Sequence, residues 1–186
     1  MIILILGLAL CISAHAAWTA APAQPLAKAL GHRQFRTLLV VAMLAGAILI
    51  VVGKSNAAFL QVWVPPFAWR ECTSLQMVAA SVVFASAVLP DSHTRALVRQ
   101  PLPVGLALAG SAHLLSNGDL ASMLLFGIPT LWAVLLVVVR VQKGGIRVLR
   151  PVMQWDLAAI LLGMIAWGAL LVFHGLLFGF ALTGPL

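Results

Sequence analysis

Three histidines lie inside long apolar segments, and they are the side chains best suited to chemistry: His15, His113 and His174. An ionisable side chain at membrane depth is costly, so it marks a functional site by default. A neutral imidazole can ligate a metal through either of its ring nitrogens. The other two histidines, His32 and His93, fall between the apolar segments, where we expect them to be solvated.

His15 and His113 are expected to lie at similar depth on two different helices. At the rise of an α-helix, His15 lies about 20 Å from the outer face and His113 about 15 Å from the inner face. Small residues flank both histidines, with Ala14 and Ala16 beside the first and Gly110 to Ala112 before the second. Two such imidazoles could ligate one haem iron from opposite faces. The alternative is that each ring only forms a hydrogen bond with a neighbouring helix.

The last of the three histidines and the acidic residues of the helix ends have structural interpretations. His174 is expected near the outer interface, where a structural role is favoured. Asp156 opens the last apolar segment, and a carboxylate at a helix N-terminus is stabilised by the helix dipole. The stretch Asn117-Gly118-Asp119 indicates a tight turn in which Asp119 caps the following helix.

Arg95 and Arg99 precede the fourth apolar segment. Their structural role would be to set the membrane topology. Their functional role would be to pair with an anionic group such as a haem propionate, and Asn117 is the further candidate for contact with a cofactor.

The composition excludes a soluble domain. Charged residues make up 8% of the chain and hydrophobic residues 63%, whereas soluble domains carry about 25% charged residues. The basic residues stand singly, so nucleic-acid binding is not expected despite a net charge of +7. Cys11 and Cys72 fall in apolar segments and are expected to be free thiols. The sequence has no HExxH, GxSxG or CxxCH motif and no glycine-rich phosphate loop.

Six apolar segments predict an all-α integral membrane helical bundle of six transmembrane helices, forming a single transmembrane domain over residues 1–186. The fourth segment is short, about 21 Å of helix against a hydrocarbon core of about 30 Å. The segments are Met1–Ala20, Thr37–Gly53, Cys72–Leu89, Val104–Asn117, Leu120–Val139 and Leu157–Phe180.

The distribution of basic residues decides whether the short fourth segment crosses the membrane. With six crossings, nine basic residues lie in the three loops on one side, against Lys54 and Arg70 on the other. With five crossings this bias disappears. The positive-inside rule therefore predicts six crossings with both termini in the periplasm. The nine residues are Lys28, Arg33, Arg36, Arg95, Arg99, Arg140, Lys143, Arg147 and Arg150.

The first apolar segment and the second loop complete the predicted topology. Met1–Ala20 has no Lys or Arg before Lys28, so the positive region of a signal peptide is missing and we expect a retained helix. Asn56–Arg70 is expected to be an outer loop without helix, because Pro65 and Pro66 disfavour one. Its tryptophans suit the interfacial belt of a membrane protein.

The central stretch of the chain resembles a known family. Arg99–Leu102, followed by Ala112–Ser122, resembles the central signature of NnrU family membrane proteins. The resemblance implies a bacterial inner-membrane protein that is linked to nitrite and nitric oxide reductase function in denitrification. The family is also similar to 15-cis-ζ-carotene isomerase, a haem b membrane enzyme, and its axial histidines would fall on His15 and His113.

Three positions depart from the family pattern. Gln100 stands where the family usually has histidine, and the basic residue that commonly follows the first-helix histidine is missing around Ala17. Gly110 stands where the isomerase has a cysteine one turn before its second histidine. A redox ligand switch that depends on this thiol would be missing here, and Cys11, one turn before His15, is the only substitute.

Three hypotheses about function follow. The first is an accessory haem b protein of nitrogen-oxide metabolism, which acts with a nitrite or nitric oxide reductase system in the inner membrane. The second is a haem-dependent isomerase that acts on a polyene dissolved in the bilayer. The third is a structural membrane protein without a cofactor, whose histidines only pack.

Overall fold

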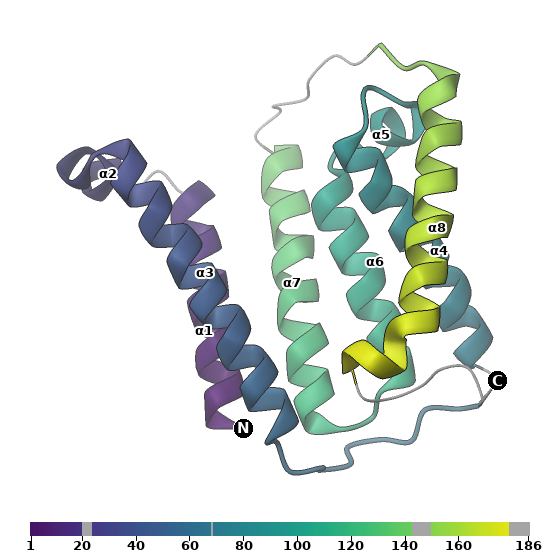
Figure 1. Ribbon diagram of the computed structural model, residues 1–186, viewed down its shortest axis with the longest axis horizontal. Helices are drawn as coiled ribbons and strands as arrows, with labels where there is room; N and C mark the ends of the chain where they lie inside the picture. The colour runs from purple at the N-terminus through teal and green to yellow at the C-terminus, as the bar shows by residue number, and fades with distance from the viewer. Residues whose placement is uncertain (20–23, 68, 143–149, 179–186) are drawn as a thin grey trace. The chain divides into compact units, whose positions relative to one another are not determined.

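The computed structural model describes residues 1–19, 24–67, 69–142 and 150–178. Apart from one isolated β-bridge between Gln61 and Asp119, the secondary structure of these residues is helical (Figure 1). The all-α membrane bundle predicted from the sequence is therefore confirmed. Six helices match the predicted segments: α1 (Ile2–Thr19), α3 (His32–Ser55), α4 (Trp69–Val88), α6 (Pro101–Ser116), α7 (Leu120–Gln142) and α8 (Met153–Phe178).

Two short helices lie in segments that were expected to be loops. They are α2 (Gln24–Leu30) and α5 (His93–Val98). The N-terminus of α5 is capped by Ser92, whose hydroxyl accepts a hydrogen bond from the Arg95 backbone N–H at 3.0 Å. Helix α3 begins earlier than predicted, directly after Gly31, whose φ of 83° lies in the left-handed region that favours glycine.

Four of the described helices are long and apolar enough to cross a membrane, namely α3, α4 from Glu71 onward, α7, and α8 as far as Leu176. Helices α1 and α6 are apolar but shorter. Most large hydrophobic side chains of α3 and α8 are exposed, as expected for surfaces in contact with lipid. The chain is a multi-pass membrane protein.

The structure consists of two compact units, each of which is described by itself. The first unit comprises Met1–Val64 and Asn117–Trp132, and the second comprises Pro65–Ser116 and Ala133–Leu186. The first part of α7 thus belongs to one unit and the rest of α7 to the other. The expectation of a single transmembrane domain stays a prediction.

In the first unit, α1 packs antiparallel against α3 along a line of small residues (Figure 1). A Cβ atom added at Gly53 would overlap the Leu4 backbone, and one added at Gly46 would overlap the Cys11 thiol. Small residues let two helix backbones approach closely in a membrane, where dispersion contacts replace the hydrophobic effect as the driving force.

In the second unit, α4 packs against both α6 and α8. Gly105 of α6 lies against the Phe84 ring, and Gly163 of α8 lies against the backbone of α4. The Gln76 side chain of α4 donates hydrogen bonds to the Leu108 carbonyl at 3.1 Å and the Ser111 hydroxyl at 2.6 Å. These polar contacts link α4 to the half of α6 that carries His113.

Contacts within each unit indicate that the short helix α6 crosses the membrane. Lys54, at the end of α3, forms an ion pair with Asp119, at the start of α7. An ion pair places both residues on the same side of the membrane. The chain between them contains α4 and α6, so either both helices cross or neither does, and α4 is long enough to cross. His93, before α6, likewise contacts Asp156, after α7. Since α7 is long and apolar enough to cross, this contact also favours a crossing by α6.

Candidate functional site

His15 lies in α1, four residues before the end of the helix, and contacts α7 within the first unit. The Trp132 indole N–H donates a hydrogen bond to His15 Nδ1 at 3.0 Å. The two rings meet edge to face, with centroids 6.0 Å apart and an interplanar angle of 88°. His15 is therefore held by a polar contact as well as by packing.

The hydrogen bond from Trp132 defines the tautomer of the neutral His15 ring. An indole nitrogen is a donor only, so His15 Nδ1 must accept and cannot carry the proton. The proton of the neutral ring is then on Nε2. A histidine that binds a metal through Nε2 normally donates a hydrogen bond from Nδ1 instead.

Cys11, one turn before His15, takes part in helix packing. Its thiol donates a hydrogen bond to the Met43 carbonyl of α3 at 3.5 Å and lies against Gly46. Neither Cys11 nor Cys72 forms a disulfide, as the sequence predicted. The only candidate thiol near His15 is thus engaged with α3.

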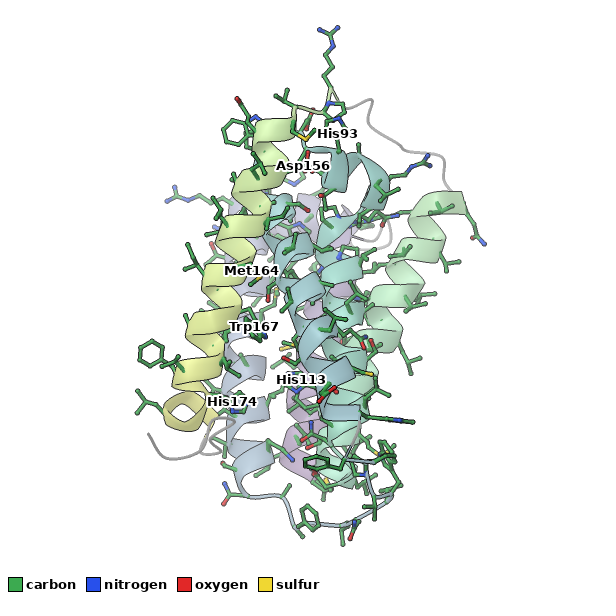
Figure 2. The ribbon with its side chains drawn as sticks, turned by 90° about the vertical axis from the view of Figure 1, so that its right-hand side faces the viewer. His93, His113, Asp156, Met164, Trp167 and His174 are labelled. Carbon is green, nitrogen blue, oxygen red and sulfur yellow. The ribbon has the colours of Figure 1, made fainter. Side chains whose placement is uncertain are left out.

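His113 lies in α6 within the second unit, three residues before the end of the helix. Because α6 begins at Pro101, His113 lies about 18 Å from the start of the helix, about 3 Å further than predicted. The ring is half-buried, and His174 of α8 lies at the same end of the second unit (Figure 2). Sequence reasoning missed this pair, since the two histidines are far apart in the chain.

The two predicted haem ligands lie in different units. His15 belongs to the first unit and His113 to the second, so the predicted pair stays a prediction. Within the described ranges, no three His, Cys, Asp or Glu side chains are grouped as ligands of one metal ion. A haem iron requires only two axial side chains, so this result bears on metal-ion sites and not on the predicted haem.

The three residues predicted to contact a cofactor lie at both ends of α6. The Arg95 guanidinium donates a hydrogen bond to the Leu89 carbonyl at 2.7 Å and thereby joins α5 to the end of α4. Arg99 is exposed and ends α5 with a φ of 62°. Asn117 follows the last residue of α6. About 24 Å of helix separates it from the arginines, and Asn117 lies at the end that carries His113.

Gln100 lies between α5 and α6. Its amide nitrogen donates a hydrogen bond to the Val137 carbonyl at 3.3 Å. Its Oε1 atom is buried and has no hydrogen-bond partner among the described residues. Gln100 thus links the start of α6 to α7.

Asp119 is the centre of a polar cluster where α3 ends and α7 begins. Lys54 Nζ lies 2.8 Å from Asp119 Oδ2 and donates a second hydrogen bond to the Ser122 hydroxyl at 2.7 Å. Asp119 Oδ2 also accepts a hydrogen bond from the Ser122 backbone N–H at 3.0 Å, which confirms the predicted cap of α7. Burial raises the pKa of Asp119, but the hydrogen bonds from Lys54 and Ser122 outweigh it and hold this pKa below its ordinary value.

The backbone of the loop that follows α3 forms hydrogen bonds next to the same cluster. The Val62 N–H donates to the Gly118 carbonyl at 2.8 Å, and the Leu120 N–H donates to the Leu60 carbonyl at 2.8 Å. The predicted tight turn at Asn117-Gly118-Asp119 therefore also forms backbone hydrogen bonds with the loop that follows α3.

Asp156, in the first turn of α8, forms a second polar cluster with α5. Its carboxylate accepts hydrogen bonds from the backbone N–H groups of His93 at 3.0 Å and Thr94 at 2.8 Å. It also accepts one from the Thr94 hydroxyl, at 2.8 Å, and contacts His93 Nδ1 at 2.8 Å. Asp156 lies in the first turn of α8, as the sequence predicts, and its carboxylate also caps the N-terminus of α5. His93 is exposed as expected, although it is paired and helical.

Comparison with known proteins gives one family. Residues 3–182 match the family described as NnrU protein. No curated protein and no solved structure matches the chain. The match covers nearly the whole chain, including both polar clusters and the four helices that are long and apolar enough to cross a membrane.

Proposed function

The chain belongs to the NnrU family, and on that premise we propose that it is an inner-membrane protein accessory to nitrogen-oxide metabolism that binds haem b. The observation that carries the proposal is the family match over residues 3–182, which includes His15 and His113. The resemblance implies a link to nitrite and nitric oxide reductases, so we propose such a reductase system as the partner.

The residues around His113 are compatible with a bound haem. His113 is half-buried in α6, and its neighbours Gly110 and Ala112 are buried and small. An imidazole at this point could serve as an axial ligand, and Asn117 lies on the same end of α6. Haem b would supply an iron that binds a small ligand such as nitric oxide or transfers one electron.

His15 is the second ligand in this proposal. Its ring can bind the iron only after it loses the hydrogen bond from Trp132. Its ring is neutral, lies in an apolar helix and is flanked by the small residues Ala14 and Ala16. To bind iron through Nε2, it must release the hydrogen bond from Trp132.

We also propose the orientation with both termini in the periplasm. The contacts Lys54–Asp119 and His93–Asp156 support the six crossings on which the charge argument depends. Among the basic residues assigned to the cytoplasm, Lys143 and Arg147 lie outside the described residues. The others still outnumber Lys54 and Arg70, so the positive-inside rule keeps the same direction.

The isomerase alternative finds less support in the structure. A bis-histidine iron has no open position, so an isomerase needs a ligand that departs, and a nearby thiol would assist this exchange. Gly110 offers no donor atom, and the Cys11 thiol is bonded to α3. We therefore favour the accessory role.

An optical spectrum of the purified protein tests the proposal. After expression with ample haem, we expect a Soret band and a haem that acid acetone extracts. His113→Ala should abolish the band and His15→Ala should shift it or abolish it. His174→Ala should leave the band largely intact. His32→Ala, at the exposed start of α3, is the matched control and should change nothing. A protein without haem under these conditions would refute the proposal.

A further inference from the structure

The contact between Trp132 and His15 is a polar interaction inside the apolar part of the first unit that the proposed function does not use. We infer that Trp132 holds His15 in a tautomer that cannot ligate iron, so that the indole and the metal compete for this ring. The inference rests on the proposed function, since it names the residue that controls the second ligand.

The competition follows from the two nitrogens of the ring. With Trp132 donating to Nδ1 at 3.0 Å, the lone pair of Nδ1 is occupied and Nε2 carries the proton. Iron at Nδ1 would need the same lone pair that accepts the indole N–H. Iron at Nε2 would need the Nε2 proton to leave and a proton to arrive at Nδ1, where it would face the indole N–H. The ring is neutral before and after, and either mode of ligation breaks the contact.

The geometry of the contact makes it specific for the indole N–H. The rings are nearly perpendicular, at 88°, with centroids 6.0 Å apart, so Trp132 presents its edge to His15. A phenylalanine at this position would keep an aromatic edge but offer no donor. Trp132→Phe therefore separates the hydrogen bond from the packing.

The contact would let the protein control whether His15 binds the iron, and this control would need no thiol. A haem held by His113 alone has an axial position open to a small ligand, whereas a bis-histidine haem has none. The hydrogen bond from Trp132 would keep His15 from binding the iron.

Nitrogen-15 NMR of the haem-depleted protein, labelled only at its five histidines and held in nanodiscs, tests the tautomer directly. We expect His15, assigned through His15→Asn, to show an unprotonated Nδ1 and a protonated Nε2. In Trp132→Phe the Nδ1–H tautomer should gain population. A wild-type His15 with its proton on Nδ1 would overturn the inference without any variant.

Hemin titration of the same samples tests the competition. Trp132→Phe should bind hemin about three- to tenfold more tightly, or show a larger low-spin fraction, as expected when one hydrogen bond no longer opposes ligation. Trp155→Phe, in the first turn of α8, is the matched control and should match the wild type. Equal affinity and spectra for Trp132→Phe and wild type would overturn the inference. If no sample binds hemin, the proposed function fails, and the NMR result alone decides whether Trp132 sets the tautomer.

Discussion

Asp119 and Asp156 both stabilise the start of a helix, but they do so in different ways. Asp119 caps its own helix, α7, and is compensated by the full positive charge of Lys54 at 2.8 Å. Asp156 caps a neighbouring helix, α5, and most of its partners are neutral donors, two backbone N–H groups and one hydroxyl. One carboxylate therefore depends on a charge pair and the other on a set of dipoles.

The two clusters join different pairs of helices. The Lys54–Asp119 pair lies at one end of the first unit, where it fixes the end of α3 against the start of α7. Asp156 fixes the short helix α5 against α8 in the second unit. Each contact therefore holds together two helices that are distant in the sequence.

Among the changes at the two carboxylates, removal of the Asp156 carboxylate should lower the free energy of unfolding the most. Asp156→Ala leaves two backbone donors and the Thr94 hydroxyl without their acceptor, and we expect it to lower the free energy of unfolding by about 2 to 3 kcal/mol. Asp156→Asn, which keeps one oxygen, should lose about half of this. The measurement is unfolding in mixed micelles followed by tryptophan fluorescence.

The matched control for Asp156 is Glu71→Ala, which removes a carboxylate from the first turn of α4. Glu71 can interact with the dipole of its own helix, which is worth less than about 1 kcal/mol. If Glu71→Ala destabilised the protein as much as Asp156→Ala, the capping of α5 would not be the source of the effect.

A double-mutant cycle on Lys54 and Asp119 should show a smaller effect. We expect a coupling free energy of roughly 1 kcal/mol between Lys54→Met and Asp119→Asn, because the pair is only partly buried and Lys54 is 35% exposed. The same cycle on His93→Ala and Asp156→Ala should couple less strongly, since His93 supplies only part of the Asp156 contacts. A larger coupling in the second cycle would reverse the comparison.

The two carboxylates also show which parts of the site the sequence could predict. The cap of α7 involves Asp119 and Ser122, three residues apart, so local pattern and turn chemistry were sufficient. The partners of Asp156 lie 62 and 63 residues away. No local signal links them, and α5 was therefore missed, although Ser92 three residues before Arg95 has the spacing of a cap.

The six helices were predictable because apolar runs of membrane length and the side of the basic residues are properties of the sequence itself. Contacts between helices are not. Trp132 is 117 residues from His15, and Lys54 was expected on the outer side without its ion pair to Asp119. Depth along a helix was predicted to within about one turn for His113, because only the first residue of α6 was misplaced.

The smallest expected effect is the dependence of stability on pH at Asp119. Its pKa is lower in the folded protein than the ordinary value of about 3.9, so the unfolded chain binds the proton first as the pH falls. The stabilisation by Asp119 is thus fully present above this value and is lost as the pH falls through the lower, folded pKa. Wild type and Asp119→Asn should therefore differ in free energy of unfolding at pH 6 and converge as the pH falls below the folded pKa of Asp119. Lys54→Met should flatten this dependence, because it removes a hydrogen bond that lowers the pKa. A difference between wild type and Asp119→Asn that persists unchanged at low pH would show that Asp119, like Asp156, acts mainly as a cap rather than through its charge.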